Sequence, residues 1–145
     1  MKVKVTIEST IENLDANGLM DGDAEKSSTT VNGIYHYLGG DATLSYNETG
    51  EGGRSLSEIE YRFDAVRVRR SGAIESELYF KEGESHSSVY SIPPYRFDAT
   101  VSAKRVRAEL TESGGNIDLL YTMKIGGAEK RARMKIWIFQ PLNQN

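Results

Sequence analysis

The sequence contains no cysteine. A chain without cysteine has no disulfide framework and no thiolate for nucleophilic or redox chemistry. Histidine is scarce as well. His36 and His86 are the only two, and neither has the spacing of a metal site or a partner in a Ser/His/Asp motif. The sequence therefore predicts no metal, no cofactor and no catalytic residue, and it favours a protein that is not an enzyme.

Long apolar runs are also missing. The first residues, Met1 to Val5, alternate charge with valine, so we expect neither a signal peptide nor a membrane helix and place the protein in the cytoplasm. The formal net charge is −3 in 145 residues, which argues against binding of nucleic acid or anionic membranes over the whole surface. The length corresponds to one domain, residues 1–145, with no internal repeat or linker.

The chain is rich in alternating apolar and polar residues. In the stretch 59–80, apolar residues recur at every second position across two tight turns, a pattern typical of three antiparallel strands with one buried face. We expect a two-residue loop that pairs Phe63 with Val66 and a three-residue loop that pairs Arg70 with Ile74. The predicted inward face comprises Ile59, Tyr61, Phe63, Val66, Val68, Arg70, Ser76, Leu78 and Phe80.

The same reasoning extends the fold to nine or ten strands. Gly39-Gly40 and Gly126-Gly127 are signals for two-residue hairpin loops, and residues 113–116 form a predicted four-residue turn. The inward phase changes from odd to even numbers near residues 103–105, which predicts a β-bulge. Consecutive hairpins with one apolar face must close or stack to bury that face. The predicted fold class is all-β, an up-and-down antiparallel β-barrel, with an open meander or a sandwich as the alternative.

Five stretches of the sequence carry a family resemblance. They are VKVTIESTIE at 3–12, GIYHYLGGDATLSYNET at 33–49, RSGAIESELYF at 70–80, SIPPYRFDATV at 91–101 and GGNIDLLYTMKIGG at 114–127. Together they resemble the YwiB-like bacterial proteins, a family of unknown function with a calycin-like (lipocalin-like) β-barrel. The resemblance implies that barrel, a bacterial origin and a cytoplasmic location. It brings no established catalytic residue.

The predicted barrel interior holds the candidate ligand site. Arg70 points inward near one barrel end, where a guanidinium needs a partner or a wet opening, and its fork suits a carboxylate or a phosphate. Five tyrosines share the inward face and are suited to line a partly polar cavity: Tyr35, Tyr37, Tyr46, Tyr61 and Tyr121. Two alternatives stay open. The rings can fill a small barrel, and Arg70 can form a structural pair near its turn.

The outer face supports other interpretations. Basic residues follow three strands in stripes, at 67 and 69, at 105 and 107, and at 131, 133 and 135, where acidic residues on neighbouring strands are expected to pair with them. Trp137 and Phe139 point outward on the last strand. Two such aromatic residues predict a homodimer interface, or a surface covered by the acidic loop 15–26 through Leu19 and Met20. That loop is expected to be solvated rather than to bind calcium.

From these features we expect a protein that binds a small anionic or amphipathic ligand in the barrel mouth. The alternative is a protein or RNA interaction module that acts through its outer surface, with a filled barrel interior. A small molecule and a second copy of the chain are the expected partners. Nucleic acid is the less favoured partner, and no membrane partner is expected.

Overall fold

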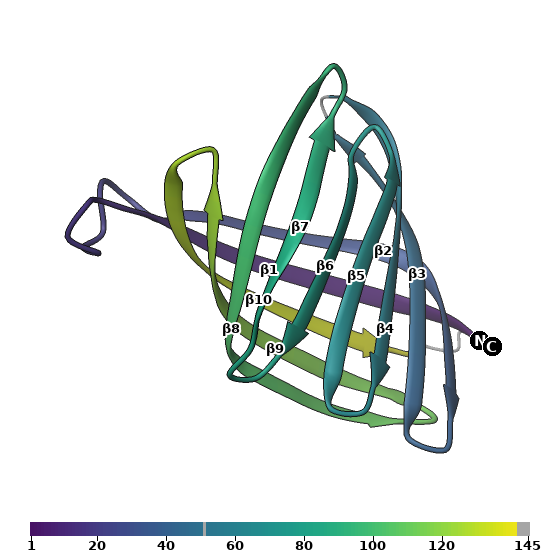
Figure 1. The fold of residues 1–145 in the computed structure, drawn as a ribbon. Coiled ribbons are helices and arrows are strands. Elements are labelled where there is room, and N and C mark those ends of the chain that lie inside the picture. The colour runs from purple at the N-terminus through teal and green to yellow at the C-terminus, as the bar shows by residue number, and fades with distance from the viewer. Residues whose placement is uncertain (51, 142–145) are drawn as a thin grey trace.

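The chain folds into a closed barrel of ten antiparallel strands over the residues described in this computed structural model, 1–50 and 52–141 (Figure 1). The strands are β1 (Lys2–Leu14), β2 (Glu25–Leu38), β3 (Asp41–Gly50), β4 (Gly53–Arg62), β5 (Ala65–Gly72), β6 (Glu75–Lys81), β7 (Ser85–Ile92), β8 (Tyr95–Thr111), β9 (Gly114–Ile125) and β10 (Ala128–Phe139). Each strand pairs with its neighbours in the chain. The predicted up-and-down barrel is confirmed, and the calycin-like assignment stays a prediction.

Pairing between β1 and β10 closes the barrel. Their register runs through eleven residue pairs, from Lys4↔Phe139 to Leu14↔Glu129. This long ladder excludes the open meander and the sandwich, because both would leave β1 and β10 as separate edges. In the ranges 1–50 and 52–141, no helix is long and apolar enough to span a membrane.

Alternation along each strand builds the core. Successive side chains of a strand point to opposite faces of the sheet, so every second residue faces the barrel interior. The largest fully buried side chains are those of Tyr35, Phe80, Ile117, Leu119 and Ile136, and they come from four different strands. The interior is therefore filled from all sides by a shared hydrophobic cluster.

The loop between β4 and β5 lies one position earlier than predicted, which shifts the pairing register by two residues. Tyr61 pairs with Val66, so the two loop residues are Phe63 and Asp64 and not Asp64 and Ala65. Both loop residues have positive φ angles, 53° and 61°, which suit the twist of a two-residue hairpin. The predicted inward position of Phe63 is wrong, since its side chain is 80% exposed. A shift of two residues keeps every other side chain on its predicted face.

Two other turns also differ from the predictions. Arg70 pairs with Ser76 rather than with Ile74, so the loop between β5 and β6 is longer than expected. Between β8 and β9 the predicted turn at 113–116 is wrong, because strand pairing already starts at Thr111↔Gly114. The following Gly115 has a φ of 146°, and a Cβ atom there would lie 1.9 Å from the Glu109 carbonyl oxygen. The glycines therefore permit close strand approach and do not mark the loop.

Other predicted features are confirmed. Gly39-Gly40 joins β2 to β3 through the pair Leu38↔Asp41, and Gly126-Gly127 joins β9 to β10. The register of β8 shifts between Ala103 and Arg105, as expected for a β-bulge. Pro93-Pro94 forms the turn between β7 and β8, after the pair Ile92↔Tyr95.

The turns lie at two opposite ends of the barrel. The turns that follow β1, β3, β5, β7 and β9 share one end, which we call the mouth end, and those that follow β2, β4, β6 and β8 share the other (Figure 1). This arrangement follows from the up-and-down order of the strands. It decides which inward side chains can meet in a ligand site.

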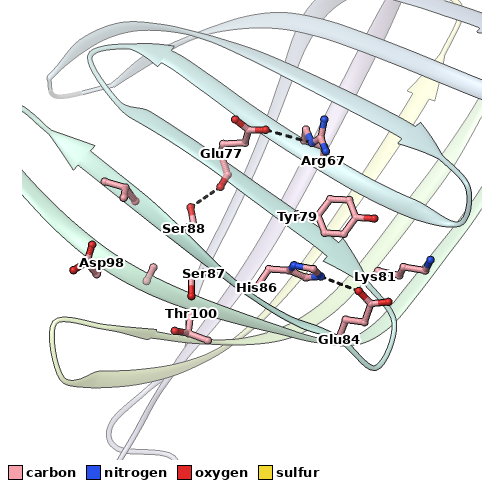
Figure 2. Close-up of a pocket in the computed structure, with 12 residues that line it drawn as sticks. Arg67, Glu77, Tyr79, Lys81, Glu84, His86, Ser87, Ser88, Asp98 and Thr100 are labelled. Atoms are coloured by element: carbon pink, nitrogen blue, oxygen red, sulfur yellow. Dashed lines mark hydrogen bonds and ion pairs between the residues drawn. The ribbon is translucent and has the colours of Figure 1, made fainter.

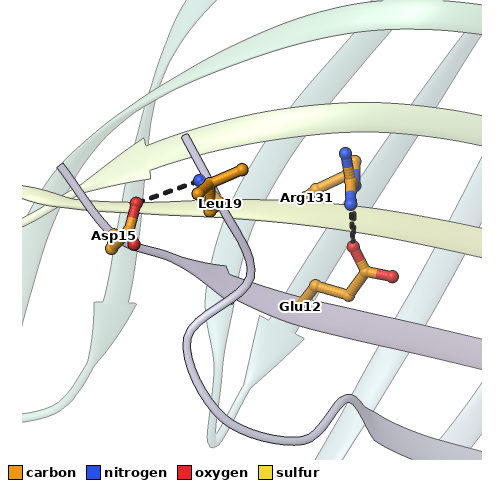
Figure 3. Close-up of polar contacts among 4 residues, drawn as sticks. All are labelled: Glu12, Asp15, Leu19 and Arg131. Atoms are coloured by element: carbon orange, nitrogen blue, oxygen red, sulfur yellow. Dashed lines mark hydrogen bonds and ion pairs between the residues drawn. The ribbon is translucent and has the colours of Figure 1, made fainter. Parts of the chain in front are cut away.

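The acidic loop after β1 extends from the mouth end (Figure 1). The Asp15 carboxylate accepts hydrogen bonds from the backbone N–H groups of Asn17, at 2.9 Å, and Leu19, at 3.0 Å. Figure 3 shows the contact with Leu19. The loop is thus held by its own turn. Leu19 is 65% exposed, so it covers no apolar surface, and this segment is solvated as predicted.

Candidate ligand site at the barrel mouth

The six residues predicted for the barrel interior divide between the two barrel ends. Arg70, Tyr46 and Tyr121 lie toward the mouth end. The other three, Tyr35, Tyr37 and Tyr61, lie on β2 and β4 toward the opposite end. A mouth site that joins Arg70 to Tyr35 and Tyr61 is therefore not what the structure shows. The residues share an inward face, but they are displaced along the strands.

The tyrosines at the far end have structural partners. Tyr35 is only 1% exposed, and its hydroxyl donates a 2.7 Å hydrogen bond to the Thr111 carbonyl across the barrel. The Tyr61 hydroxyl donates to the Asp64 carboxylate at 3.1 Å, within the hairpin loop. Tyr37 packs at the edge of the core. These phenols serve the fold, so the alternative in which tyrosines fill the barrel holds at this end.

Arg70 lies in a continuous inward row of polar residues. Strand pairing aligns Tyr46 with Ser57, Ser57 with Arg70, Arg70 with Ser76 and Ser76 with Tyr90. We call this row, which crosses β3 to β7, the polar belt. Adjacent strands are about 4.8 Å apart, so the three central residues span roughly 10 Å of sheet. The belt places one guanidinium between two hydroxyl groups.

The centre of the polar belt lacks hydrogen-bond partners. Within the part of the chain that the structure describes, the buried Ser57 Oγ, Arg70 Nε and Ser76 Oγ atoms have none. Arg70 also forms no ion pair with any described carboxylate, so the alternative of a structural ion pair at its turn does not hold among the described residues. A buried polar group without a partner costs about 1–3 kcal/mol. Such groups are rare in folded proteins and need a physical explanation.

Two cavities meet at Arg70. One, of about 390 Å³, has mostly apolar walls that include Val68, Leu78, Phe80, Met123 and Met134. The other, of about 540 Å³, lies below the turns after β3 and β5 and is lined mainly by polar residues and glycines, among them Ser9, Thr29, Asn47, Glu48 and Gly53. Ligand pockets usually measure roughly 300–1,000 Å³, so each cavity can hold a small molecule.

The phenols near Arg70 are neutral at physiological pH. Burial raises the pKa of Tyr46 to about 12, the charge of Glu48 adds to this effect, and the charge of Arg70 opposes it. The Ser57 hydroxyl lowers the pKa of Tyr46 and has the smallest effect of the four. Ser57 and Tyr46 nevertheless form no hydrogen bond of ordinary geometry. Burial likewise raises the pKa of Tyr121, against the influence of Arg70. Both tyrosines therefore keep a proton that can be donated to a ligand.

A separate hollow opens where β6 and β7 diverge. These strands share only the pairs Glu75↔Ser91 and Ser76↔Tyr90, and the hollow beyond them measures about 980 Å³ (Figure 2). Some of its charged groups pair with each other. Arg67 lies 3.3 Å from Glu77, and the His86 Nε2 atom lies 2.9 Å from Glu84. Lys81 and Asp98 line the same hollow without an ion pair among the described residues. The hollow therefore holds charges of both signs, whereas the polar belt presents a single cation.

Two of the three basic stripes of the outer face are cross-paired among the described residues. Arg67 and Arg69 share Glu77, and Arg133 contacts Asp118 at 2.9 Å. Arg131 forms an ion pair with Glu12 of the neighbouring strand (Figure 3). The hydrogen bond from Arg133 holds the pKa of the Asp118 carboxyl below its usual range. The expected pairing is therefore present for Arg67, Arg69, Arg131 and Arg133, with partners on β1, β6 and β9. The described residues show no ion pair for the stripe at 105 and 107 or for Lys135.

Trp137 and Phe139 lie on the outer face of β10, because they alternate with Ile136 and Ile138, which are buried. Lys135 Nζ sits 6.0 Å from the Trp137 ring, and Phe139 is 44% exposed. The acidic loop does not cover them. It follows the end of the β1–β10 ladder at Glu129, eight residues or about 26 Å from Trp137 along β10. The lid alternative is wrong, and the dimer interface stays a prediction.

Sequence reasoning missed two members of the polar belt. Ser57 has the same phase as Ile59 and Tyr61, so extending the alternation two residues back would have found it. Tyr90 lies on a strand whose phase the sequence leaves undefined, because polar residues occupy both of its faces. Ser76 was predicted to face inward, but nothing in the sequence shows that it lacks a hydrogen-bond partner.

The fold and the belt define a class of protein, a closed ten-stranded antiparallel β-barrel with a polar row across its interior. The chain belongs to the family described as Domain of unknown function (DUF1934), whose model matches residues 6–137. It is 26% identical to the "Uncharacterized beta-barrel protein YwiB" of Bacillus subtilis (strain 168) over 110 residues. The aligned region covers 76% of this chain and 78% of that protein. The predicted resemblance to YwiB-like proteins is thereby confirmed.

A solved structure shows the same fold. The crystal structure of the ywiB protein from Bacillus subtilis aligns with a TM-score of 0.80 and 23% identity, over 97% of this chain and 94% of that one. This likeness establishes the barrel architecture. The Bacillus subtilis protein is described as uncharacterised, so it assigns no role to the polar belt.

Proposed function

We propose that the protein binds a small amphipathic anion in the barrel mouth, at Arg70. The observation that carries the proposal is an inward-facing arginine that has no ion pair among the described residues and lies where two cavities meet. An interior cation without a partner is costly for the fold. A ligand anion supplies the missing partner.

The chemistry of the apolar cavity supports an amphipathic ligand. Its walls combine aliphatic and aromatic side chains with three cationic residues, Arg70, Lys130 and Arg133, of which Arg133 is paired with Asp118. Ile92 and Phe97 line the same cavity and remain 41% and 39% exposed, so apolar surface continues to the rim. Binding pockets typically pair such walls with a few placed polar groups. The cavity thus suits a molecule with an anionic head and an apolar body.

The outer surface gives less support to a protein or RNA interaction module. Arg67, Arg131 and Arg133 are each engaged by a carboxylate, and phosphate contacts would have to compete with those pairs. Nucleic acid is therefore the weaker hypothesis. No role in catalysis is proposed.

Decanoate, a carboxylate with an apolar chain, tests the proposal in titration calorimetry and native mass spectrometry. Wild-type protein is expected to bind it in a one-to-one complex. Arg70→Met should weaken binding about 10- to 100-fold, because a hydrogen bond to a charged group is lost. Arg69→Met is the matched control, since this neighbouring arginine is exposed on the outer face. A wild-type protein that binds no amphipathic anion, or equal losses in both variants, would refute the proposal.

A further inference from the structure

We infer that the polar belt is a head-group site for a monocarboxylate, held by Arg70 together with the hydroxyls of Ser57 and Ser76. The inference rests on the proposed function and adds the class of ligand and its orientation. Strand pairing places the two serines on either side of the arginine, on the same inward face. The three side chains therefore supply donors to one point of the interior.

The two serine hydroxyls form no hydrogen bond of ordinary geometry in the described structure. Ser57 is 0% and Ser76 is 7% exposed, and neither hydroxyl has such a partner among residues 1–50 and 52–141. Other inward positions of these strands are apolar, as at Ile59 and Leu78, or satisfied, as at Ser55, which accepts a hydrogen bond from the Ile74 N–H. A serine turns its hydroxyl by rotation about one torsion, so both can redirect a proton toward an oxygen at the guanidinium. Each then donates a charge-assisted hydrogen bond.

Charge favours a carboxylate over a phosphate. Arg70 is the single cation in the polar belt, and its planar fork matches the two oxygens of a carboxylate. A phosphate monoester carries about −1.5 to −2 charges at neutral pH. Glu48 lines the polar cavity beside Arg70, and its charge already acts on Tyr46 in the belt. A second negative charge on the ligand would find no second cation in the belt and would lie near this carboxylate, since Lys130 lines only the apolar cavity.

The two cavities set the orientation of the ligand. With its head at Arg70, the apolar chain has one suitable direction, along Phe80, Met123 and Met134 toward Phe97 at the rim. The other cavity has apolar side chains too, such as Ile7, Val31 and Ile74, but Glu48, serines, threonines and glycines make up most of its lining. An apolar chain would meet fewer apolar walls there than in the first cavity. We therefore assign the chain to the 390 Å³ cavity.

Serine-to-alanine variants separate a binding role from a structural one. Ser57→Ala, Ser76→Ala and the double variant remove hydroxyls that have no partner in the free protein, so the melting temperature of the ligand-free protein should stay the same or rise. The affinity for decanoate should fall about 10-fold or more for each variant. Ser87→Ala, at an exposed serine on β7, is the matched control and should change neither quantity.

The experiment measures decanoate, decyl phosphate and decanol binding by titration calorimetry, and melting of each ligand-free variant. Wild-type protein is expected to bind decanoate at least about 10-fold more tightly than the other two. Three results would overturn the head-group site: serine variants that bind as wild type does, a lower melting temperature in both variants, or equal binding of decyl phosphate. If Arg70→Met alone abolishes binding, the proposed function stands and only this inference fails.

Discussion

Tyr35→Phe tests how the barrel interior is divided between its two ends. The change keeps the buried ring and removes one hydroxyl, whose 2.7 Å hydrogen bond ties β2 to the Thr111 carbonyl at the end of β8. A typical internal hydrogen bond contributes about 0.5–1.5 kcal/mol. Thr111 is exposed, so water can partly replace the lost donor. We expect the free energy of unfolding to fall by about 1 kcal/mol and the melting temperature by about 2–4 °C.

The assay combines urea denaturation with decanoate titration on the same preparations. Tyr35→Phe should lower stability and leave decanoate affinity unchanged, because Tyr35 does not line either cavity at Arg70. Tyr121→Phe is the counterpart at the mouth end, where the ring lines the apolar cavity, and it should lower decanoate affinity. A loss of affinity in Tyr35→Phe would show that the two barrel ends form one site and would refute the division.

Three further predictions concern stability and assembly. Raising the pH from 10 to 12 should lower the free energy of unfolding, because Tyr46 ionises with a pKa of about 12 in the folded protein and about 10 in the unfolded chain. Tyr46→Phe should remove about 2 kcal/mol of that decrease in denaturant titrations. Sedimentation should find a wild-type dimer and a Trp137→Ser monomer, and a monomeric wild type would exclude the interface. Gly115→Ala should cost more than about 3 kcal/mol, whereas Gly39→Ala, with nothing within 4 Å, should cost about 1 kcal/mol in the same unfolding assay.

The faces of the strands could be predicted from the sequence more reliably than the pairing between them. Alternation fixes which side of a strand faces inward, and a register error of two residues leaves that side unchanged. The loop between β4 and β5 shows this, because its predicted pairing was wrong while Tyr61, Val66 and Val68 kept their phase. Phe63 lies outside the core, contrary to the prediction, because it is a loop residue.

The composition of the candidate site depended on the pairing and was predicted less well. Arg70 meets Ser57 and Ser76 because of loop lengths on both sides of β5. Phase alone groups Tyr35 and Tyr61 with Arg70, since it says nothing about height along the barrel axis. Missing hydrogen-bond partners also depend on three-dimensional neighbours. These features become visible only when the register of all ten strands is known.

The ladder between β1 and β10 has a consequence for the order of folding. Nine of the ten strand interfaces are hairpins of consecutive segments, whereas this ladder joins Lys4 to Phe139 across almost the whole chain. Contacts between such distant segments are slow to form, because the chain between them must first be ordered. Until β10 docks, β1 presents an open edge to which other chains can add. A nascent or truncated chain that lacks β10 should therefore aggregate through β1.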